Sequence, residues 1–243
     1  MSTATINSVS HALRMIEVMS GEGPLNISEI ARHLDLPRPT VYRLVQTFVD
    51  QGFLVQSGTE YRLSLRLLEL ASPILSASRL EDLGKPALQR LVDETGETAH
   101  FAVLDGDRVG YVSKIESDKP IRMFSRVGWR GPLHATGVGK ALLAASEDAL
   151  LEKICASPME LFTPATISCA ETLRQEVVSI RECGYSIDRE ELVEGLVCVA
   201  VAVRTEHRII GAVSVSGPST RMSNTAFFVA HLRQAAASLV MAL

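Results

Sequence analysis

The apolar residues in the first third of the chain recur with the spacing of three helices. A first helix over residues 8–20 would bury one apolar stripe, made of Val9, Ala12, Leu13, Ile16 and Met19. A second helix over 27–34 follows Asn26, an N-cap residue with an acid three positions later. Pro37 disfavours continuation of that helix, and the apolar spacing predicts a third helix over 38–51.

The third helix has an apolar side and a polar side. Its inward residues are expected to be Val41, Leu44, Val45 and Phe48. The opposite side carries Thr40, Tyr42, Arg43, Gln46 and Thr47. Two short strands at 53–55 and 61–63 follow, joined by a turn at 57–59. Three short helices and a hairpin predict a winged helix-turn-helix domain.

The polar side of the third helix has the chemistry that reads DNA. Arg43 can donate two hydrogen bonds to guanine, and Gln46 can recognise adenine. In the hairpin, Tyr61 and Arg62 would contact phosphate or the minor groove. The candidate DNA-binding residues are Arg38, Thr40, Tyr42, Arg43, Gln46, Thr47, Tyr61 and Arg62. A solvated polar face is the alternative, because residues 1–66 hold as many acidic residues as arginines.

A helical pattern continues from Leu65 to about Thr95, with interruptions expected near Pro73 and Pro86. Its first part carries an apolar stripe of Leu67, Leu68, Ala71 and Leu75. A stripe this exposed between two domains predicts burial against the same helix of a second chain. We therefore expect a DNA-binding domain over 1–66, a linker helix over 67–80 and a second domain over 81–243.

The second domain alternates between strand and helix patterns. We expect strands at 98–104, 108–115, 185–190, 196–204 and 208–216, helices at 137–155 and 170–183, and a closing helix with Phe228, Leu232, Ala235 and Leu239 as its buried stripe. Strands in two groups with helices between and around them indicate an α+β domain with an antiparallel sheet.

The last two strands have one bulky face and one face of small side chains. Pairing them in the simplest register sets Cys198 across from Ser214 and Ala200 across from Ala212. The valine-rich face, which includes Ile209, should be core. The small face leaves space for a ligand, with Cys198, Ser214 and Ser216 as weak donors, or it lets a helix pack closely.

Thr136, Gly137, Val138 and Gly139 stand at the start of the apolar helix that begins near residue 137. Unpaired backbone N–H groups at a helix start can hold a carboxylate, although an ordinary tight helix start explains the same residues. Met123 and Leu133 could supply an apolar wall.

Composition narrows the class of protein. The chain has 243 residues, a formal charge of −4 and 47% hydrophobic residues, which excludes disordered and fibrous proteins. Four cysteines without a CxxC pair predict buried thiols of a cytoplasmic protein and no metal site. We also expect neither a signal peptide nor a membrane span, and no cofactor.

Several strings of residues resemble the IclR-type (isocitrate lyase regulator) family of transcription regulators. They are residues 27–31, 36–44, 52–54 and 61–63 in the first domain, and 132–143, 184–191, 195–200 and 212–218 in the second. The resemblance implies a DNA-binding domain, a linker helix that dimerises it, and a small-molecule (effector) binding domain similar to the GAF fold. We expect no catalytic residue. It also implies that the glycine segment, Asp188, Cys198, Ser214 and Ser216 contact a small acid.

Three interpretations of function follow. We expect a transcription regulator that binds a palindromic operator of a catabolic operon as a dimer or a tetramer. A repressor is favoured over an activator, because the family contains more repressors. Asp188 would repel an anionic ligand unless it accepts hydrogen bonds from the ligand's hydroxyl groups, which favours a sugar acid or a hydrated keto acid as effector. The alternative is a transcription activator that responds to an aromatic acid. Less favoured are a hydrolase that uses Cys198 with a histidine and a protein-interaction adaptor.

Overall fold

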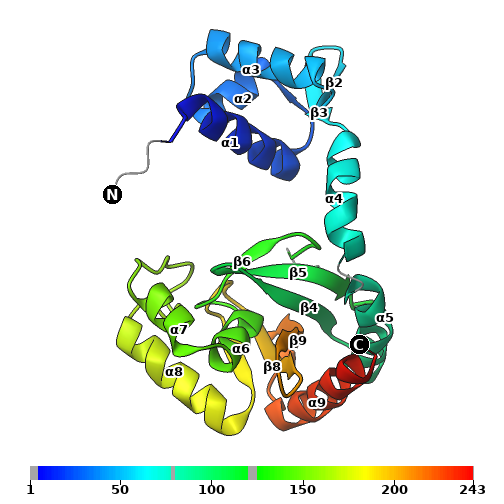
Figure 1. Ribbon diagram of the computed structural model, residues 1–243, viewed down its shortest axis with the longest axis vertical. Helices are drawn as coiled ribbons and strands as arrows, with labels where there is room; N and C mark the ends of the chain where they lie inside the picture. The colour runs from blue at the N-terminus through cyan, green and yellow to red at the C-terminus, as the bar shows by residue number, and fades with distance from the viewer. Residues whose placement is uncertain (1–4, 78–79, 120–124, 243) are drawn as a thin grey trace. The chain divides into compact units, whose positions relative to one another are not determined.

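The computed structural model describes residues 5–77, 80–119 and 125–242, and the chain divides into two compact units, residues 1–77 and 78–243 (Figure 1). The first unit has one hydrophobic core. The second has two, one on each face of a six-stranded sheet. Among the described helices, none is long and apolar enough to cross a membrane.

The first unit confirms the winged helix-turn-helix. Its helices are α1 (Asn7–Glu22), α2 (Ile27–Leu34) and α3 (Arg38–Asp50). Its strands are β1 (Leu25–Asn26), β2 (Leu54–Ser57) and β3 (Glu60–Leu63), in the antiparallel order β1-β3-β2. The two-residue strand β1 was not predicted, because it is too short to show an alternating pattern.

Local hydrogen bonds define the corner between α2 and α3. The Asn26 side chain accepts hydrogen bonds from the backbone N–H groups of Ser28 and Glu29, and the Glu29 carboxylate accepts one from Asn26. At the other end Asp35 adopts a left-handed conformation with φ 54°, which lets the Leu36 N–H reach the Ala31 carbonyl. The predicted N-cap at Asn26 is confirmed.

One expectation for α1 is wrong. Val9 and Leu13 were placed in the buried stripe, but their side chains are 52% and 57% exposed. The buried residues of the helix are Met15 and Met19. The apolar stripe is wider than the core needs, so α1 presents apolar side chains to its surroundings as well as to the core.

The helical region after the wing consists of α4 (Arg66–Ala77) and α5 (Leu80–Thr95). The expected interruptions at Pro73 and Pro86 are wrong, since both positions fall inside these helices. Residues 78–79, between the two helices, and the side chain of Leu75 lie outside the described part of the structure. In the first turn of α4 the Leu68 side chain is 62% exposed.

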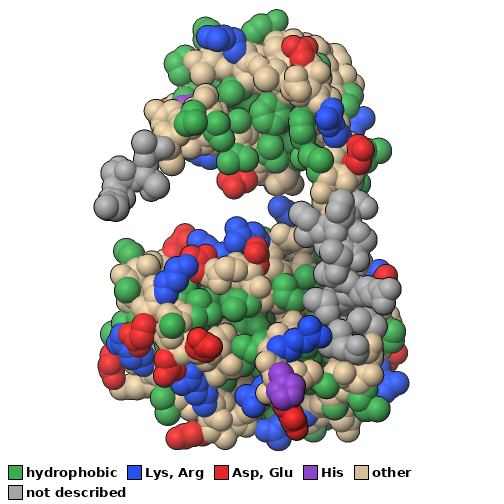
Figure 2. Space-filling view, viewed as in Figure 1, with side chains coloured by type: hydrophobic (Ala, Val, Ile, Leu, Met, Phe, Trp, Pro, Cys, Tyr) green, Lys and Arg blue, Asp and Glu red, His purple; other side chains and the backbone are tan. Residues whose placement is uncertain are grey.

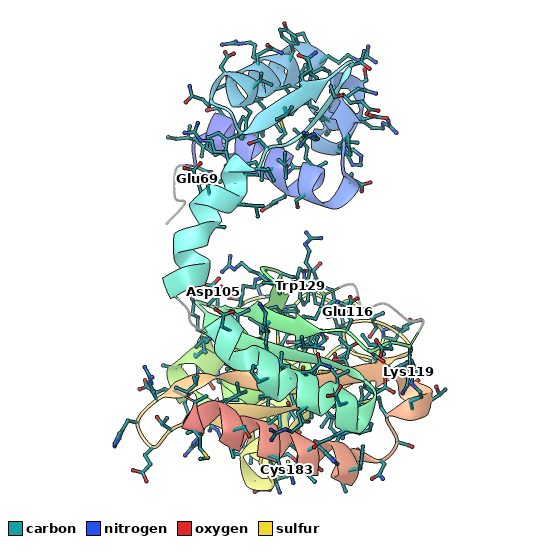
Figure 3. The ribbon with its side chains drawn as sticks, turned by 90° about the vertical axis from the view of Figure 1, so that its right-hand side faces the viewer. Glu69, Asp105, Glu116, Lys119, Trp129 and Cys183 are labelled. Atoms are coloured by element: carbon teal, nitrogen blue, oxygen red, sulfur yellow. The ribbon has the colours of Figure 1, made fainter. Side chains whose placement is uncertain are left out.

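The second unit confirms the α+β class. Its antiparallel sheet has the order β6-β5-β4-β9-β8-β7, with β4 (Thr98–Asp105), β5 (Arg108–Ile115), β6 (Arg130–Pro132), β7 (Ser186–Arg189), β8 (Leu196–Arg204) and β9 (Ile209–Pro218). Figure 3 places Asp105 at one end of the β4–β5 hairpin and Glu116 at the other, with Trp129 between them. Strand β6 was not predicted.

Helices cover both faces of this sheet (Figure 1). On one face lie α6 (Gly137–Ala145), α7 (Asp148–Cys155) and α8 (Ala170–Cys183), and on the other lie α5 and α9 (Thr225–Met241), which follows the short 3-10 turn Ser219–Arg221. The single helix expected over 137–155 is two helices, since α6 ends at Ala145 and α7 begins at Asp148.

The predicted register of β8 and β9 is wrong by two residues. Cys198 lies across from Ser216, and Ala200 lies across from Ser214. One residue of the shift arises at the turn, where Arg204 pairs with Ile209 and not with Arg208, and the bulge between Val203 and Arg204 adds the second by inserting one residue into β9. A shift of two keeps each side chain on its predicted face beyond the bulge.

The bulge also changes which side chain at the start of β9 is core. Ile209, expected on the valine face, packs against the cluster under α6, and Ile210 packs with the valines instead. Beyond it the valine face is confirmed as core, with Val199, Val201, Val203, Val213 and Val215 buried against α5 and α9.

Candidate functional site

The outward face of α3 is exposed, as the sequence predicts. Val41 and Val45 are buried, whereas Tyr42 is 53% exposed. The exposed candidates are Arg38, Thr40, Tyr42, Arg43 and Thr47 on α3 and Arg62 on β3, and Gln46 is half-buried. The Thr47 hydroxyl donates a 2.8 Å hydrogen bond to the Arg43 carbonyl, so only its oxygen lone pairs remain for a further partner.

Tyr61 is not on this surface. Its side chain is 5% exposed and belongs to the core of the first unit. The unpredicted strand β1 explains the burial, because Leu25 pairs directly with Tyr61 across the small sheet. Tyr61 is therefore a core residue. A broad hollow lies between α2 and the wing, which is the β2–β3 hairpin, and it is bordered by Arg32 on α2, a residue absent from the predicted set.

A second candidate site lies where the start of α6 meets the small face of the sheet. A small cavity there is lined by His100, Tyr111, Ser125, Thr136, Gly137, Asp188, Leu192, Leu196, Cys198 and Ser216. Five of these were predicted to meet: Thr136, Gly137, Asp188, Cys198 and Ser216. The cavity encloses about 20 Å³, which is room for one or two water-sized molecules.

Of the other five lining residues, which were not predicted, Leu192 and Leu196 are close in sequence to Asp188 and Cys198, whereas His100, Tyr111 and Ser125 come from distant parts of the chain. His100 is the most informative of them, because it pairs across the sheet with Ser214 on β9. Once β4 is placed beside β9, the two-residue period puts His100 on the same face as Ser214 and Ser216. The sequence of β4 alone does not indicate that β9 is its neighbour in the sheet.

The remaining predicted residues do not line the cavity. Leu133 and Val138 are fully buried in the core beneath α6. Ser214 lies one row further along the sheet, between Ala200 and His100. Met123 lies outside the described residues.

The glycines at the start of α6 serve close packing. A Cβ at Gly137 would lie 2.8 Å from the Cys198 sulfur, so a side chain there would force the helix away from the sheet. The Gly139 N–H donates to the Thr136 hydroxyl, which in turn donates to the Pro132 carbonyl. The Gly139 amide is thus occupied, which contradicts its expected role as a carboxylate donor.

His100, which lines the cavity, carries a buried polar atom without a hydrogen-bond partner among the described residues. Its Nε2 lies 2.7 Å from the Ser125 hydroxyl, while Nδ1 has no hydrogen-bond partner among the described residues. Burial, with the charge of Lys114, lowers the pKa of His100 to about 3, so the ring is neutral at pH 7. A neutral ring offers one donor and one acceptor, which suits a polar ligand.

Asp188 is the acidic group of the cavity. It is 3% exposed, and its Oδ1 accepts a 2.7 Å hydrogen bond from the Glu191 N–H. Burial is the main reason that its pKa rises to about 7, with the charge of Glu191 adding to the shift. Near neutral pH the carboxyl therefore exists in both forms and can accept or donate a hydrogen bond.

A buried ion cluster supports this acid. The Lys140 ammonium is 0% exposed and donates to the Glu191 carboxylate at 2.6 Å, to the Ile187 carbonyl at 2.7 Å and to the Glu176 carboxylate at 2.8 Å. These three bonds use all its hydrogens. They tie α6 to β7, to the β7–β8 connection and to α8.

The thiol of Cys198 is not prepared for nucleophilic chemistry. Burial raises its pKa to about 11, with a further contribution from the charge of Asp188, so the thiol stays protonated at pH 7. Neutral His100 is hydrogen-bonded to Ser125. Within the described ranges, no three His, Cys, Asp or Glu side chains are grouped to hold a metal ion.

Comparisons with known proteins cover nearly the whole chain. The family described as "Bacterial transcriptional regulator IclR C-terminal" matches residues 73–241, and the "IclR helix-turn-helix domain" matches residues 8–58. The regulator XynR of Escherichia coli K12 is 34% identical over 98% of this chain and 97% of its own. KdgR of Dickeya chrysanthemi is 33% identical over 97% of this chain and 79% of its own.

Solved structures agree with these matches. The Thermotoga maritima IclR superposes with a TM-score of 0.75 at 26% identity and covers 97% of this chain and 98% of its own. An IclR homologue from Microbacterium hydrocarbonoxydans, in complex with 4-hydroxybenzoate, superposes with a TM-score of 0.80 at 27% identity over 97% of this chain and 98% of its own.

The raised pKa of Asp188 predicts a pH-dependent stability cost. Its folded-state pKa, about 7, lies above the ordinary 3.8, so the folded state loses stability as pH rises between these values. Asp188→Asn removes the titration and keeps an acceptor for the Glu191 N–H. We expect the variant to match the parent near pH 4 and to gain about 2–4 kcal/mol at pH 8.

Urea unfolding of both proteins at several pH values measures this difference. As a control, Asp93→Asn changes an exposed carboxyl on α5 and should give no pH-dependent gain. A constant difference between parent and Asp188→Asn from pH 4 to pH 8 would contradict the raised pKa.

Proposed function

Because the chain belongs to the IclR family of bacterial transcriptional regulators, we propose that it is a DNA-binding regulator, most simply a repressor of a catabolic operon, controlled by a small organic acid. The observation that carries the proposal is the cavity beside Gly137, where His100 has an unused ring nitrogen and Asp188 has a pKa near neutrality. We assign no catalytic residue, no metal and no cofactor. The cytoplasm, where bacterial operators are found, is the proposed location.

The exposed face of α3 supports the DNA-binding half of the proposal. Arg43 has the donor geometry for guanine, and Gln46 next to it can read adenine. Arg38, Arg62 and the exposed threonines are placed for phosphate contacts, which position the domain without reading sequence. Arg32, on α2 beside the wing, is a further phosphate candidate.

The first prediction concerns Arg43. Arg43→Ala should weaken operator binding by about 1–3 kcal/mol and relax base preference at one position in each half-site. Binding-site selection followed by gel-shift titration measures both effects. Arg14→Ala, which removes an exposed arginine from α1, is the matched control and should change neither. Tight, equally selective binding by Arg43→Ala would show that α3 does not read the operator.

Exposed apolar side chains support a dimer. Outside α3 and the wing, those of the first unit are Ile6, Val9, Leu13, Leu65, Leu68 and Leu70, and Figure 2 shows hydrophobic side chains gathered on the visible face of this unit. They lie on α1, just before it, and at the start of α4. Leu65 is 75% exposed and Ile6 is 68% exposed, which is costly for a monomer in water. A symmetric pair of such units would bind a palindrome.

The second prediction concerns assembly. Sedimentation at micromolar concentration should show a dimer or a tetramer, and Leu13→Glu or Leu68→Glu should shift it toward monomer because each buries a charge in the interface. Val178→Glu on α8, where the parent side chain is 52% exposed, similar to Leu13 at 57%, is the matched control. A monomeric parent protein would refute the dimer and the palindrome.

The geometry favours a small effector. Helix α6 packs directly on the small face at Cys198, and the enclosed space is about 20 Å³, so even a small acid needs the walls to move apart. Such a movement gives the two conformations that a regulator requires. Sugar acids and keto acids, with a hydroxyl or carbonyl for Asp188 and His100, fit better than bulkier acids. An aromatic acid is the alternative effector, because the Microbacterium homologue was solved in complex with 4-hydroxybenzoate.

The third prediction concerns the effector and pH. An anion beside Asp188 raises the pKa of that carboxyl further, so binding takes up a proton. Affinity for the acid should be highest below pH 7 and fall up to about tenfold per pH unit above it. Asp188→Asn should remove this pH dependence while leaving operator binding intact.

Thermal-shift and calorimetric titrations with a panel of sugar, keto and aromatic acids at pH 6, 7 and 8 test this. Binding with the same pH profile in parent and Asp188→Asn would remove Asp188 from the site. A response confined to aromatic acids would support the alternative effector class.

A further inference from the structure

A second, larger cavity opens on the other side of the segment that leads into α6. It encloses about 200 Å³ and is bounded by the start of β5, residues 132–134, α7 and the loop 157–162. Leu133, Ile154, Met159 and Phe162 supply most of its apolar wall. Its space is about ten times that of the cavity at Gly137. The hairpin end marked by Asp105 in Figure 3 is the end of the sheet next to it.

Arg108 gives this cavity an unused positive charge. It is exposed at the start of β5, and its guanidinium makes no ion pair or side-chain hydrogen bond with the described residues. The neighbouring charges are different: Lys153 is bonded to Asp107 at 3.2 Å, so that pair neutralises itself. An unpaired guanidinium beside an apolar cavity is suited to a carboxylate, which it can bind through two parallel hydrogen bonds.

His134 holds the outer wall in place. Its side chain is 7% exposed, and its Nε2 lies 3.0 Å from the Glu160 carbonyl. Its ring centroid lies 6.0 Å from that of Phe162, at an interplanar angle of 31°. Burial lowers the pKa of His134, with the charge of Arg108 adding to the shift, so the ring is neutral. His134, Phe162 and the thioether of Met159 therefore give the cavity polarizable lining groups.

We propose that this cavity is a second ligand site, which binds a small aromatic monocarboxylic acid with its carboxylate on Arg108 and its ring against Met159 and Phe162. The volume suits a single ring with one or two substituents. Arg108 is left to bind one carboxylate, because Lys153 is paired with Asp107, and the nearby Glu160 carboxylate disfavours a second negative charge on the ligand. The site shares no lining residue with the cavity at Gly137, so it stands independently of the proposed effector site.

Calorimetry of the intact protein with benzoate tests the proposal, with benzamide as the uncharged probe of the same shape. Benzoate should bind at least tenfold more tightly than benzamide. Arg108→Gln should weaken benzoate binding at least tenfold and leave benzamide unchanged. Arg90→Gln, which removes an exposed arginine from α5 on the opposite side of the sheet, should have no effect.

Two further variants test the walls. Glu160→Gln removes a like charge and should tighten benzoate binding two- to fivefold, whereas Met159→Trp fills the cavity and should abolish it. Melting temperatures of all variants show that they fold. Absence of benzoate binding at millimolar concentration, or unchanged binding in both Arg108→Gln and Met159→Trp, would overturn the second site. Binding lost in Asp188→Asn but kept in Arg108→Gln would assign benzoate to the cavity at Gly137 and overturn it equally.

Discussion

The buried ammonium of Lys140 holds together the parts of the second unit that form the cavity at Gly137. It bonds to the Glu191 carboxylate at 2.6 Å and to the Ile187 carbonyl at 2.7 Å, which flank Asp188 in sequence. A charge this deeply buried is stable only while its partners remain, and breaking such a pair typically costs about 3–5 kcal/mol. The position of Asp188 therefore depends on α6 staying where Gly137 allows it to pack.

Close packing at Gly137 and the polar groups around Asp188 occur at the same contact between α6 and the sheet. The sheet presents small side chains to α6, and the helix start comes within contact of Cys198. The polar groups left around that contact, above all His100 Nδ1, have hydrogen-bonding capacity that the fold does not use. Unused buried polar atoms cost stability, so their retention in a closely packed region favours a role in ligand binding over one in folding.

The sequence predicted best what depends on neighbouring residues. Asn26 caps α2 because its partners are two and three residues away, and the outward face of α3 follows from the helical period alone. Features that depend on distant partners were missed or wrong. His100 enters the cavity only because β4 pairs with β9, and Tyr61 is buried only because β1 joins its sheet.

The error in the sheet register has a physical cause that the alternating pattern does not show. The turn and the bulge at Val203 and Arg204 each shift the register by one residue, so Ser216 and not Ser214 faces Cys198. From the sequence alone, Lys140 would be expected to be an exposed lysine of a surface helix. Its burial depends on Glu176 and Glu191, which lie 36 and 51 residues further along the chain.

The central claim is that one chain binds DNA through α3 and changes its affinity when an acid occupies the cavity at Gly137. The most direct measurement is the operator affinity of the intact protein, by fluorescence anisotropy, with and without a saturating acid identified by mass spectrometry of the co-purified ligand. The account predicts a change of at least about fivefold, the lower range of measured coupling between sites. An operator affinity that stays the same at saturation would contradict it.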